Sequence, residues 1–339
     1  MSLIKSASIV SLLTLASRIT GLVRDILMST AFGVSAMTDA FWVAFRVPNM
    51  LRRMFAEGAF SQAFVPVLAA SKARDGEAAT HALIDSVATL LTLALVVTCV
   101  LGMVGAPVLV YLLASGLPTE GFDAAVHMTR WMFPYIACMS LVALGAGVLN
   151  TWKNFAIPAA TPVLLNVAMI TAAWLGAPWF AALGVEPIYA MAVGVMAGGA
   201  LQLGAIWWAL HRRGLAPRLR LSVSGARAAW AQSDTRRIVQ LMGPALLGVS
   251  VSQISLLINT QIASHLTVGS VTWLNNASLL MEFPTAMLGV ALGVVLMPQL
   301  AAAKASQDHE RFSSMIDWGL RLVVLLAVPC AVALLTFAQ

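Results

Sequence analysis

Residues 86–113 read SVATLLTLALVVTCVLGMVGAPVLVYLL, a run of 28 residues that contains no Asp, Glu, Lys, Arg or His. A helix of about 20 apolar residues is long enough to cross the hydrocarbon core of a bilayer. A helix on the surface of a soluble protein would show a polar stripe over such a length, and this run has none. The stretch therefore predicts a membrane-spanning helix.

The composition of the whole chain agrees with this reading. Hydrophobic residues make up 60% of the 339 residues and charged residues only 10%, whereas about a quarter of a soluble domain is charged. Similar apolar runs predict an all-α integral membrane protein, a polytopic helical bundle with about nine crossings. We place them near 7–30, 38–70, 86–113, 131–150, 157–178, 187–210, 238–265, 274–303 and 316–339.

Lysine and arginine gather in alternate loops of this arrangement. These loops hold Lys5, Lys72, Arg74, Lys153, Arg212, Arg213, Arg218, Arg220, Arg227, Arg236, Arg237, Lys304 and Arg311, while the intervening loops hold only Arg130. Loops rich in Lys and Arg stay in the cytoplasm, so we expect a cytoplasmic N-terminus. The 211–237 segment is then a basic cytoplasmic loop, which either only fixes the topology or also touches anionic lipid head groups.

Two segments 232 residues apart resemble each other. FVPVLAASKA at 64–73 matches LMPQLAAAKA at 296–305. A repeat of six crossings gives two halves of the same orientation, as in several transporter folds. We therefore expect a complete six-helix lobe at 1–210, the basic loop at 211–237, and about three helices of a second lobe at 238–339. The second lobe would be incomplete, as in a C-terminally truncated version of a longer protein.

The first two predicted helices carry charges inside their apolar runs. Residues 39–70 would be about 48 Å long as a helix, close to the roughly 40–45 Å of a bilayer with its head groups, which places the centre of this helix at mid-membrane. Helical spacing gathers the polar side chains on related faces of the two helices. The candidate site residues are Ser17, Arg18, Arg24, Asp25, Asp39, Arg46, Asn49, Arg52, Arg53 and Glu57.

Two interpretations of these charges differ in what neutralises them. A charged side chain at mid-membrane costs about 2.5–3.5 kcal/mol on the insertion scale. A salt-bridge network would pair Arg53 with Glu57 and Arg18 with Asp25, but five arginines exceed the three acids. The surplus favours a water-filled cationic cavity that takes an anion, because arginine offers a planar fork of donors to phosphate or carboxylate.

The seventh predicted span carries uncharged polar residues and the eighth continues this face to Glu282; these residues line the same cavity or hydrogen-bond between helices. The candidates are Gln253, Asn259, Thr260 and Glu282. The pairs Gly194/Gly198 and Gly289/Gly293 are typical of close helix packing. We find no motif for covalent chemistry, a cofactor or a metal, so the chain is expected to be a transporter rather than an enzyme.

Several motifs closely resemble the MurJ/MviN family of lipid II flippases, of the MOP exporter superfamily. They are Ser17-Arg18, Arg24-Asp25, Thr38-Asp39-Ala-Phe41, Pro48-Asn49, the run from Arg52 to Pro66, Gly147-x-Leu-Asn150, Asn166, Gly243-Pro244, Gln253-Ile254-Ser255 and Met281-Glu282-Phe283-Pro284. The similarity runs through the whole chain.

This resemblance implies a multi-pass protein of the bacterial inner membrane that acts in cell-wall synthesis. Its cargo would be lipid II, the undecaprenyl-diphosphate-linked peptidoglycan precursor, moved from the cytoplasmic to the periplasmic leaflet. Membrane lipids and cell-wall synthesis proteins would be its other partners, with no nucleic acid and no cofactor. The family's cavity positions match Arg18, Arg24, Asp25, Asp39, Arg52, Arg53 and Glu57.

The chain departs from the family at Ser278-Leu279, where the family has Asp-Arg, and it lacks the last five of the family's fourteen helices. Other readings therefore stay open. They are a flippase or exporter for another polyprenyl-linked or amphiphilic substrate, an inactive or scaffolding fragment, and an enzyme acting on polyprenyl phosphates, against which the absence of acid/base or metal clusters counts.

Overall fold

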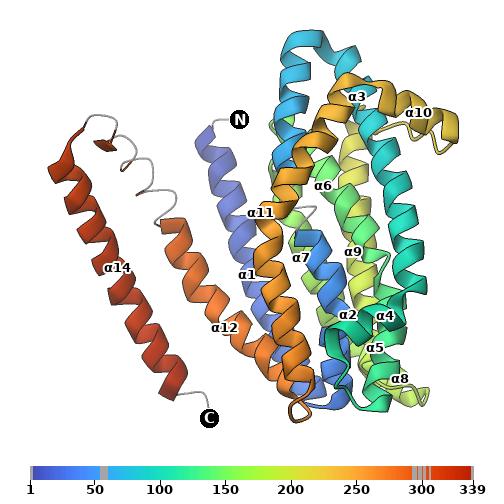
Figure 1. The fold of residues 1–339 in the computed structure, drawn as a ribbon, viewed down its shortest axis with the longest axis vertical. Helices are drawn as coiled ribbons and strands as arrows, with labels where there is room; N and C mark the ends of the chain where they lie inside the picture. Colours follow the sequence, from blue (N-terminus) through green and yellow to red (C-terminus); the bar gives the residue numbers. More distant parts are fainter. Residues whose placement is uncertain are drawn as a thin grey trace. The chain divides into compact units, whose positions relative to one another are not determined.

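The computed structural model describes residues 3–53, 60–291, 296, 300, 303–304 and 307–336. These residues form helices joined by short connections, with no strand among them (Figure 1). The chain divides into two compact units, Met1–Thr272 and Trp273–Gln339, and each is described by itself.

The helices follow one another along the chain as an unbroken all-α series. They are α1 (Leu3–Phe32), α2 (Ala36–Arg52), α3 (Phe60–Val104), α4 (Ala106–Ala114), α5 (Thr119–Met132), α6 (Tyr135–Thr151), α7 (Ala156–Thr171), the π-helix η2 (Ala172–Gly176), α8 (Ala177–Ala182), α9 (Tyr189–Arg212), α10 (Val223–Ala231), α11 (Ser233–Ser264), α12 (Ser270–Ala291) and α14 (His309–Thr336).

Where the structure describes them, the nine predicted crossings lie largely on one helix or on consecutive helices of this series, while residues 54–59, 292–295, 297–299, 301–302 and 337–339 lie outside the described residues. Among the described residues, five segments are long and apolar enough to cross a membrane by themselves: 60–104, 119–151, 156–182, 189–212 and 312–333. A sixth is added if the two arms of α11, on either side of a bend, count as one span. The prediction of an all-α, polytopic membrane fold is confirmed.

The connection expected between the second and third crossings is wrong. Residues 71–85 are not a loop, because α3 runs through them with a single break at Gly76 (φ 78°, ψ −175°). Glycine takes this left-handed conformation without the clash of a Cβ atom. Charged residues end an apolar run, but they do not end a helix, so both arms of α3 continue past the ends of their apolar runs up to Gly76.

The ends of these two arms are tied to the start of α11. The Arg74 guanidinium contacts the Asp75 and Asp234 carboxylates at 2.7 and 2.9 Å. The hydrogen bond from Arg74 lowers the pKa of the Asp75 carboxyl. This contact links α3 and α11 outside the apolar spans.

The division expected at residue 238 is not where the compact units part. The helix α11 packs on α3 and α4 inside the first unit, and the boundary between the units falls after Thr272. The lobes expected at 1–210 and 238–339 stay a prediction.

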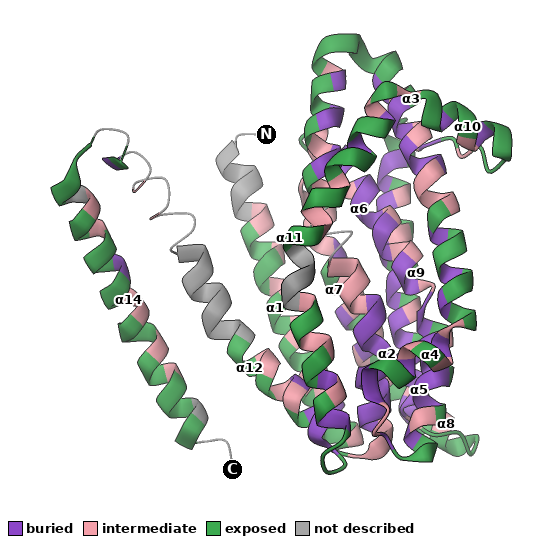
Figure 2. Cartoon of the chain, in the orientation of Figure 1, coloured by how far each residue is buried: buried purple, intermediate pink, exposed green. Residues whose placement is uncertain are grey.

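The core of the first unit lies around α2, α5, α6 and α9, where buried residues are concentrated (Figure 2). The rings of Phe41 and Phe45 stack with their centroids 5.9 Å apart, and Phe45 lies 6.3 Å from Tyr135 of α6. Every residue of α2 from Thr38 to Pro48 is buried. The packing therefore surrounds α2, including its charged positions.

The glycines Gly194 and Gly198 let α9 approach α7 closely, as their spacing predicts. A Cβ atom on Gly194 would lie 2.6 Å from the Cβ atom of Ala172, and one on Gly198 would lie 2.7 Å from Leu165. The second predicted pair, Gly289 and Gly293, lies outside the residues whose side chains are described.

We predict that Gly194→Ala destabilises the protein by about 1–3 kcal/mol, since a rigid Ala172 methyl group faces the new one and the helices must separate. The matched control is Gly204→Ala on the same helix, where a new Cβ meets nothing within 4 Å. The control should be neutral or stabilising by about 0.5–1 kcal/mol. Thermal unfolding in detergent measures both, and equal effects would contradict the packing assigned to Gly194.

Candidate functional site

The first group of candidate residues lies where α1 packs on α7. The Arg24 guanidinium contacts Asp25 Oδ1 through Nε at 2.9 Å and Nη2 at 2.8 Å. Its Nη1 donates to Asn166 Oδ1 of α7 at 2.9 Å. The side chains of Arg24 and Asp25 remain 18% and 22% exposed, so this ion pair is only partly enclosed by protein.

The neighbouring candidates on α1 differ in exposure. Ser17 is half-buried, and its carbonyl oxygen accepts a hydrogen bond from Asn166 Nδ2 at 2.9 Å. Arg18 is exposed. Helical spacing put Asp25 on the same face as Arg18 and predicted a pair between them. The structure shows the Asp25 carboxylate in contact with Arg24, its neighbour in sequence.

Asp39 is 97% buried at the start of α2, with 3% exposure, and its carboxylate holds the beginning of α12. One oxygen, Oδ2, accepts from the Gly269 N–H at 2.7 Å. The other, Oδ1, accepts from the N–H and the hydroxyl of Thr272 at 2.8 and 2.5 Å. First-turn N–H groups lack partners within their own helix, and a carboxylate is favoured there by the helix dipole.

The local backbone supports these hydrogen bonds from Gly269 and Thr272 to the Asp39 carboxylate, which we call the Asp39 clasp. Gly269 has φ 99°, a conformation that suits glycine, and it turns its N–H toward Asp39. The carboxylate is thereby occupied by neutral donors. It does not form an ion pair with any arginine in the part of the chain that the structure describes.

Arg46 lies two helical turns further along α2 and is only 8% exposed. Its Nε and Nη2 atoms have no hydrogen-bond partner within the described structure. Arg53 adds a second positive charge to its surroundings. A buried cation with open donors attracts an anion, since an uncompensated charge is costly away from water.

The remaining candidates on α2 lie at its end. The Arg52 Nε donates to Asn49 Oδ1 at 3.1 Å, and all three of Asn49, Arg52 and Arg53 are half-buried. The expected partner of Arg53, Glu57, lies outside the described residues. The structure thus joins Arg24 with Asp25 and Asn49 with Arg52, each pair within one helix.

The second-lobe candidates fall into different surroundings. Gln253 is half-buried, and its Oε1 has no hydrogen-bond partner among the described residues. Asn259 is exposed, whereas Thr260 is fully buried and its hydroxyl donates to the Leu256 carbonyl at 2.7 Å. The side chain of Glu282 on α12 lies outside the described residues. Among the described side chains of this group, Gln253 is therefore the one with a buried polar atom that has no hydrogen-bond partner.

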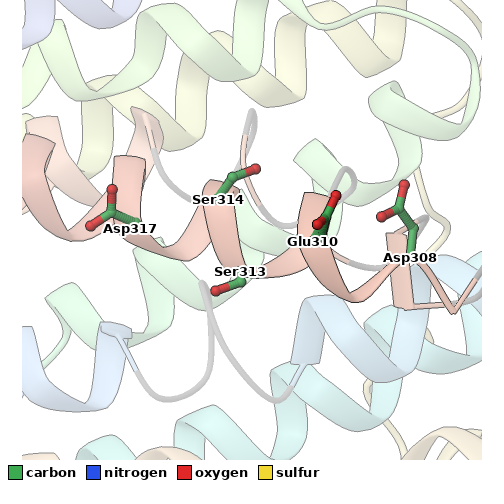
Figure 3. A pocket seen from close by; sticks show the side chains of 5 residues that line it. All are labelled: Asp308, Glu310, Ser313, Ser314 and Asp317. Carbon is green, nitrogen blue, oxygen red and sulfur yellow. The ribbon is translucent and has the colours of Figure 1, made fainter.

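One hollow of the described structure belongs to the second unit and has the wrong charge for an anion. It has a volume of about 670 Å³ at the start of α14. Figure 3 shows its lining side chains, Asp308, Glu310, Ser313, Ser314 and Asp317. Three carboxylates would repel a phosphate group, so this hollow is not the candidate site.

Comparison with known proteins identifies the family. The family model described as lipid II flippase MurJ matches residues 28–339. The chain belongs to the MurJ family. The lipid II flippase MurJ of Burkholderia cenocepacia is 49% identical over 340 residues, which cover 100% of this chain and 64% of that protein. The probable lipid II flippase MurJ of Vibrio cholerae is 37% identical, covering 99% of this chain and 64% of that protein.

A solved structure agrees with the sequence relatives. The lipid II flippase MurJ in an inward closed conformation matches with a TM-score of 0.76 and 25% identity, covering 96% of this chain and 64% of that one. The chain spans about 64% of the length of these MurJ proteins.

Two contacts of the site had not been expected from the sequence. Asn166 is among the motifs shared with the MurJ family, but its position on α7 gives no sign that it reaches Arg24. The residues that Asp39 holds, Gly269 and Thr272, contribute mainly backbone N–H groups, which any residue but proline carries. A polar residue alone in an apolar span was the one available signal for Asn166.

We predict that Asp39→Ala destabilises the protein by about 2–3 kcal/mol, because it leaves buried N–H groups of Gly269 and Thr272 without an acceptor. Thr272→Val removes only the hydroxyl and should cost about 1 kcal/mol. Thermal unfolding compares the two variants. Protease cleavage within 265–270 should rise in Asp39→Ala alone, and equal cleavage in both variants would contradict the clasp.

Proposed function

We propose that this chain binds lipid II and moves it from the cytoplasmic to the periplasmic leaflet of the bacterial inner membrane, with its N-terminus in the cytoplasm. In this proposal the diphosphate enters a central cationic cavity formed by the charged faces of α1 and α2. Gln253 contributes from α11. The names of the MurJ relatives and the family membership of the whole chain support the cargo.

The buried guanidinium of Arg46 carries the proposal. Its Nε and Nη2 are open in the described structure, and the carboxylate on its own helix, Asp39, is occupied by the start of α12. Positive charge inside the span is therefore in excess. A diphosphate has the charge and the oxygen geometry that an arginine fork binds with two parallel hydrogen bonds.

The clasp of Asp39 gives this cavity a closed side. In the proposed orientation the 265–270 loop faces the periplasm, so the hydrogen bonds from Gly269 and Thr272 to Asp39 hold the periplasmic ends of α2 and α12 together. Release of cargo to the periplasm would require these bonds to break while the cytoplasmic side closes. A small number of hydrogen bonds suits a contact that must form and open repeatedly.

The direct test is lipid II translocation in proteoliposomes containing this chain, beside the Burkholderia cenocepacia MurJ protein as a positive control. The proposal expects translocation by both proteins. Binding of lipid II without translocation would reduce the function of this chain to recognition, and failure to bind or translocate while the control is active would contradict the proposal.

We predict that Arg46→Met weakens binding of undecaprenyl diphosphate about tenfold or more, because it removes charge-assisted hydrogen bonds. Its thermal stability should be unchanged or raised, since a buried cation without a partner is replaced by an apolar side chain of similar length. The control is Arg227→Ala, which removes an equal charge from exposed α10 and should alter neither property. Lower stability with unchanged binding would show that Arg46 has only a structural role.

Charge reversal at Arg24 should abolish binding while the protein still inserts. Arg24→Glu places a carboxylate beside Asp25, so the pair repels the diphosphate. Membrane insertion is followed by protease protection and binding by the affinity for undecaprenyl diphosphate. Full binding in a correctly inserted variant would remove Arg24 from the site.

A further inference from the structure

Asn166 of α7 makes hydrogen bonds on both sides of its amide, and all of them go to α1. Its Oδ1 accepts from Arg24 Nη1 at 2.9 Å. Its Nδ2 donates to the Ser17 carbonyl at 2.9 Å and to Thr20 Oγ1 at 3.0 Å. The residue is 5% exposed. This one side chain therefore links the Arg24 guanidinium to the Thr20 hydroxyl one turn before it and to the Ser17 carbonyl two turns before it.

The chemistry of the partners fixes the orientation of this amide. A guanidinium can only donate, so it must face the amide oxygen, and a carbonyl can only accept, so it must face the amide nitrogen. Gly21 lies beside this amide, and a Cβ atom at that position would be in ordinary van der Waals contact with Asn166 Nδ2 at 3.5 Å. Asparagine is thus suited to this position, whereas aspartate would turn a carboxylate oxygen toward the Ser17 carbonyl.

The contacts also leave the guanidinium partly open. Asp25 Oδ1 accepts from Nε and lies 2.8 Å from Nη2 in an ion pair, and Asn166 accepts one N–H of Nη1. Arginine carries five N–H groups, which is more than these contacts use, and 18% of the side chain is exposed. An arginine held on two sides loses less freedom when it binds an oxyanion.

We infer that Asn166 is a positioning residue, which holds the Arg24 guanidinium in the orientation that binds the diphosphate. The inference rests on the proposed function. Asn166 acts through Arg24, with no contact of its own to the cargo. The same amide fixes α1 to α7, so the binding group and the helix that carries it are held by one residue.

The test compares undecaprenyl diphosphate binding, in detergent, by the full chain and by Asn166→Leu, Arg24→Ala and the double variant. Leucine has the same number and branching of side-chain heavy atoms as asparagine but neither donates nor accepts a hydrogen bond. We expect Asn166→Leu to weaken binding about tenfold when Arg24 is present, and by less than about twofold in the Arg24→Ala background. A residue with only a packing role would weaken binding equally in both backgrounds, and that result would overturn the inference.

The matched control is Gln202→Met on α9. Gln202 is a buried amide that bridges two helices of the same unit, with its Nε2 donating to the Thr161 carbonyl at 2.8 Å. It does not contact Arg24 in the described structure. We expect this variant to keep full affinity, and a loss as large as that of Asn166→Leu would assign both effects to general disruption and contradict the inference.

The variants distinguish a failure of the positioning role of Asn166 from a failure of the proposed site at Arg24. Weaker binding in Arg24→Ala together with normal binding in Asn166→Leu would remove the positioning role and leave the proposed function intact. Normal binding in Arg24→Ala would contradict the proposed site, and the positioning role with it. Asn166→Gln, which keeps both kinds of hydrogen-bonding atom, should recover part of the affinity lost in Asn166→Leu.

Discussion

The structure depends on how one buried helix, α2, accommodates its charges. Every residue from Thr38 to Pro48 is buried, and the run includes both Asp39 and Arg46. A helix that packs on all sides normally carries apolar residues throughout. Asp39 is compensated by the backbone N–H groups at the start of α12, while two nitrogen atoms of Arg46 are open in the described structure. This imbalance within one helix is the basis of the proposed anion site.

This arrangement connects packing with the proposed cargo. The aromatic rings of Phe41 and Phe45 fill the apolar side of α2 against α6, so the helix is held firmly and Arg46 cannot move to the bilayer surface as a flexible lysine or arginine at a helix end does. On α1, Arg24 is restrained in another way, by Asp25 and Asn166. A fixed cation binds an anion with a smaller loss of freedom than a mobile one. The two helices thus offer guanidinium groups that are already in place.

Much of this fold could be predicted from the sequence, because the run 86–113 and its counterparts leave no alternative to membrane-spanning helices. The ends of the helices were harder to predict from the sequence. Lys72, Arg74 and Asp75 end the apolar pattern, and yet the helix continues through them to Gly76. The sequence predicted which helices carry buried charges, but it did not predict which residues those charges contact. Helical spacing brings out the polar faces of α1 and α2, whereas the contact of Arg24 with Asn166 joins residues 142 positions apart, and the acceptor role of Asp39 depends on backbone atoms that have no sequence signature.

The central claim is that the excess positive charge inside the bilayer binds a diphosphate. It is tested most directly by an experimental structure of this chain with undecaprenyl diphosphate bound. The account predicts phosphate oxygens about 2.7–2.9 Å from Nε or Nη2 of Arg46 and from the guanidinium of Arg24. A diphosphate bound elsewhere, with Arg46 instead facing a carboxylate of this chain, would contradict it.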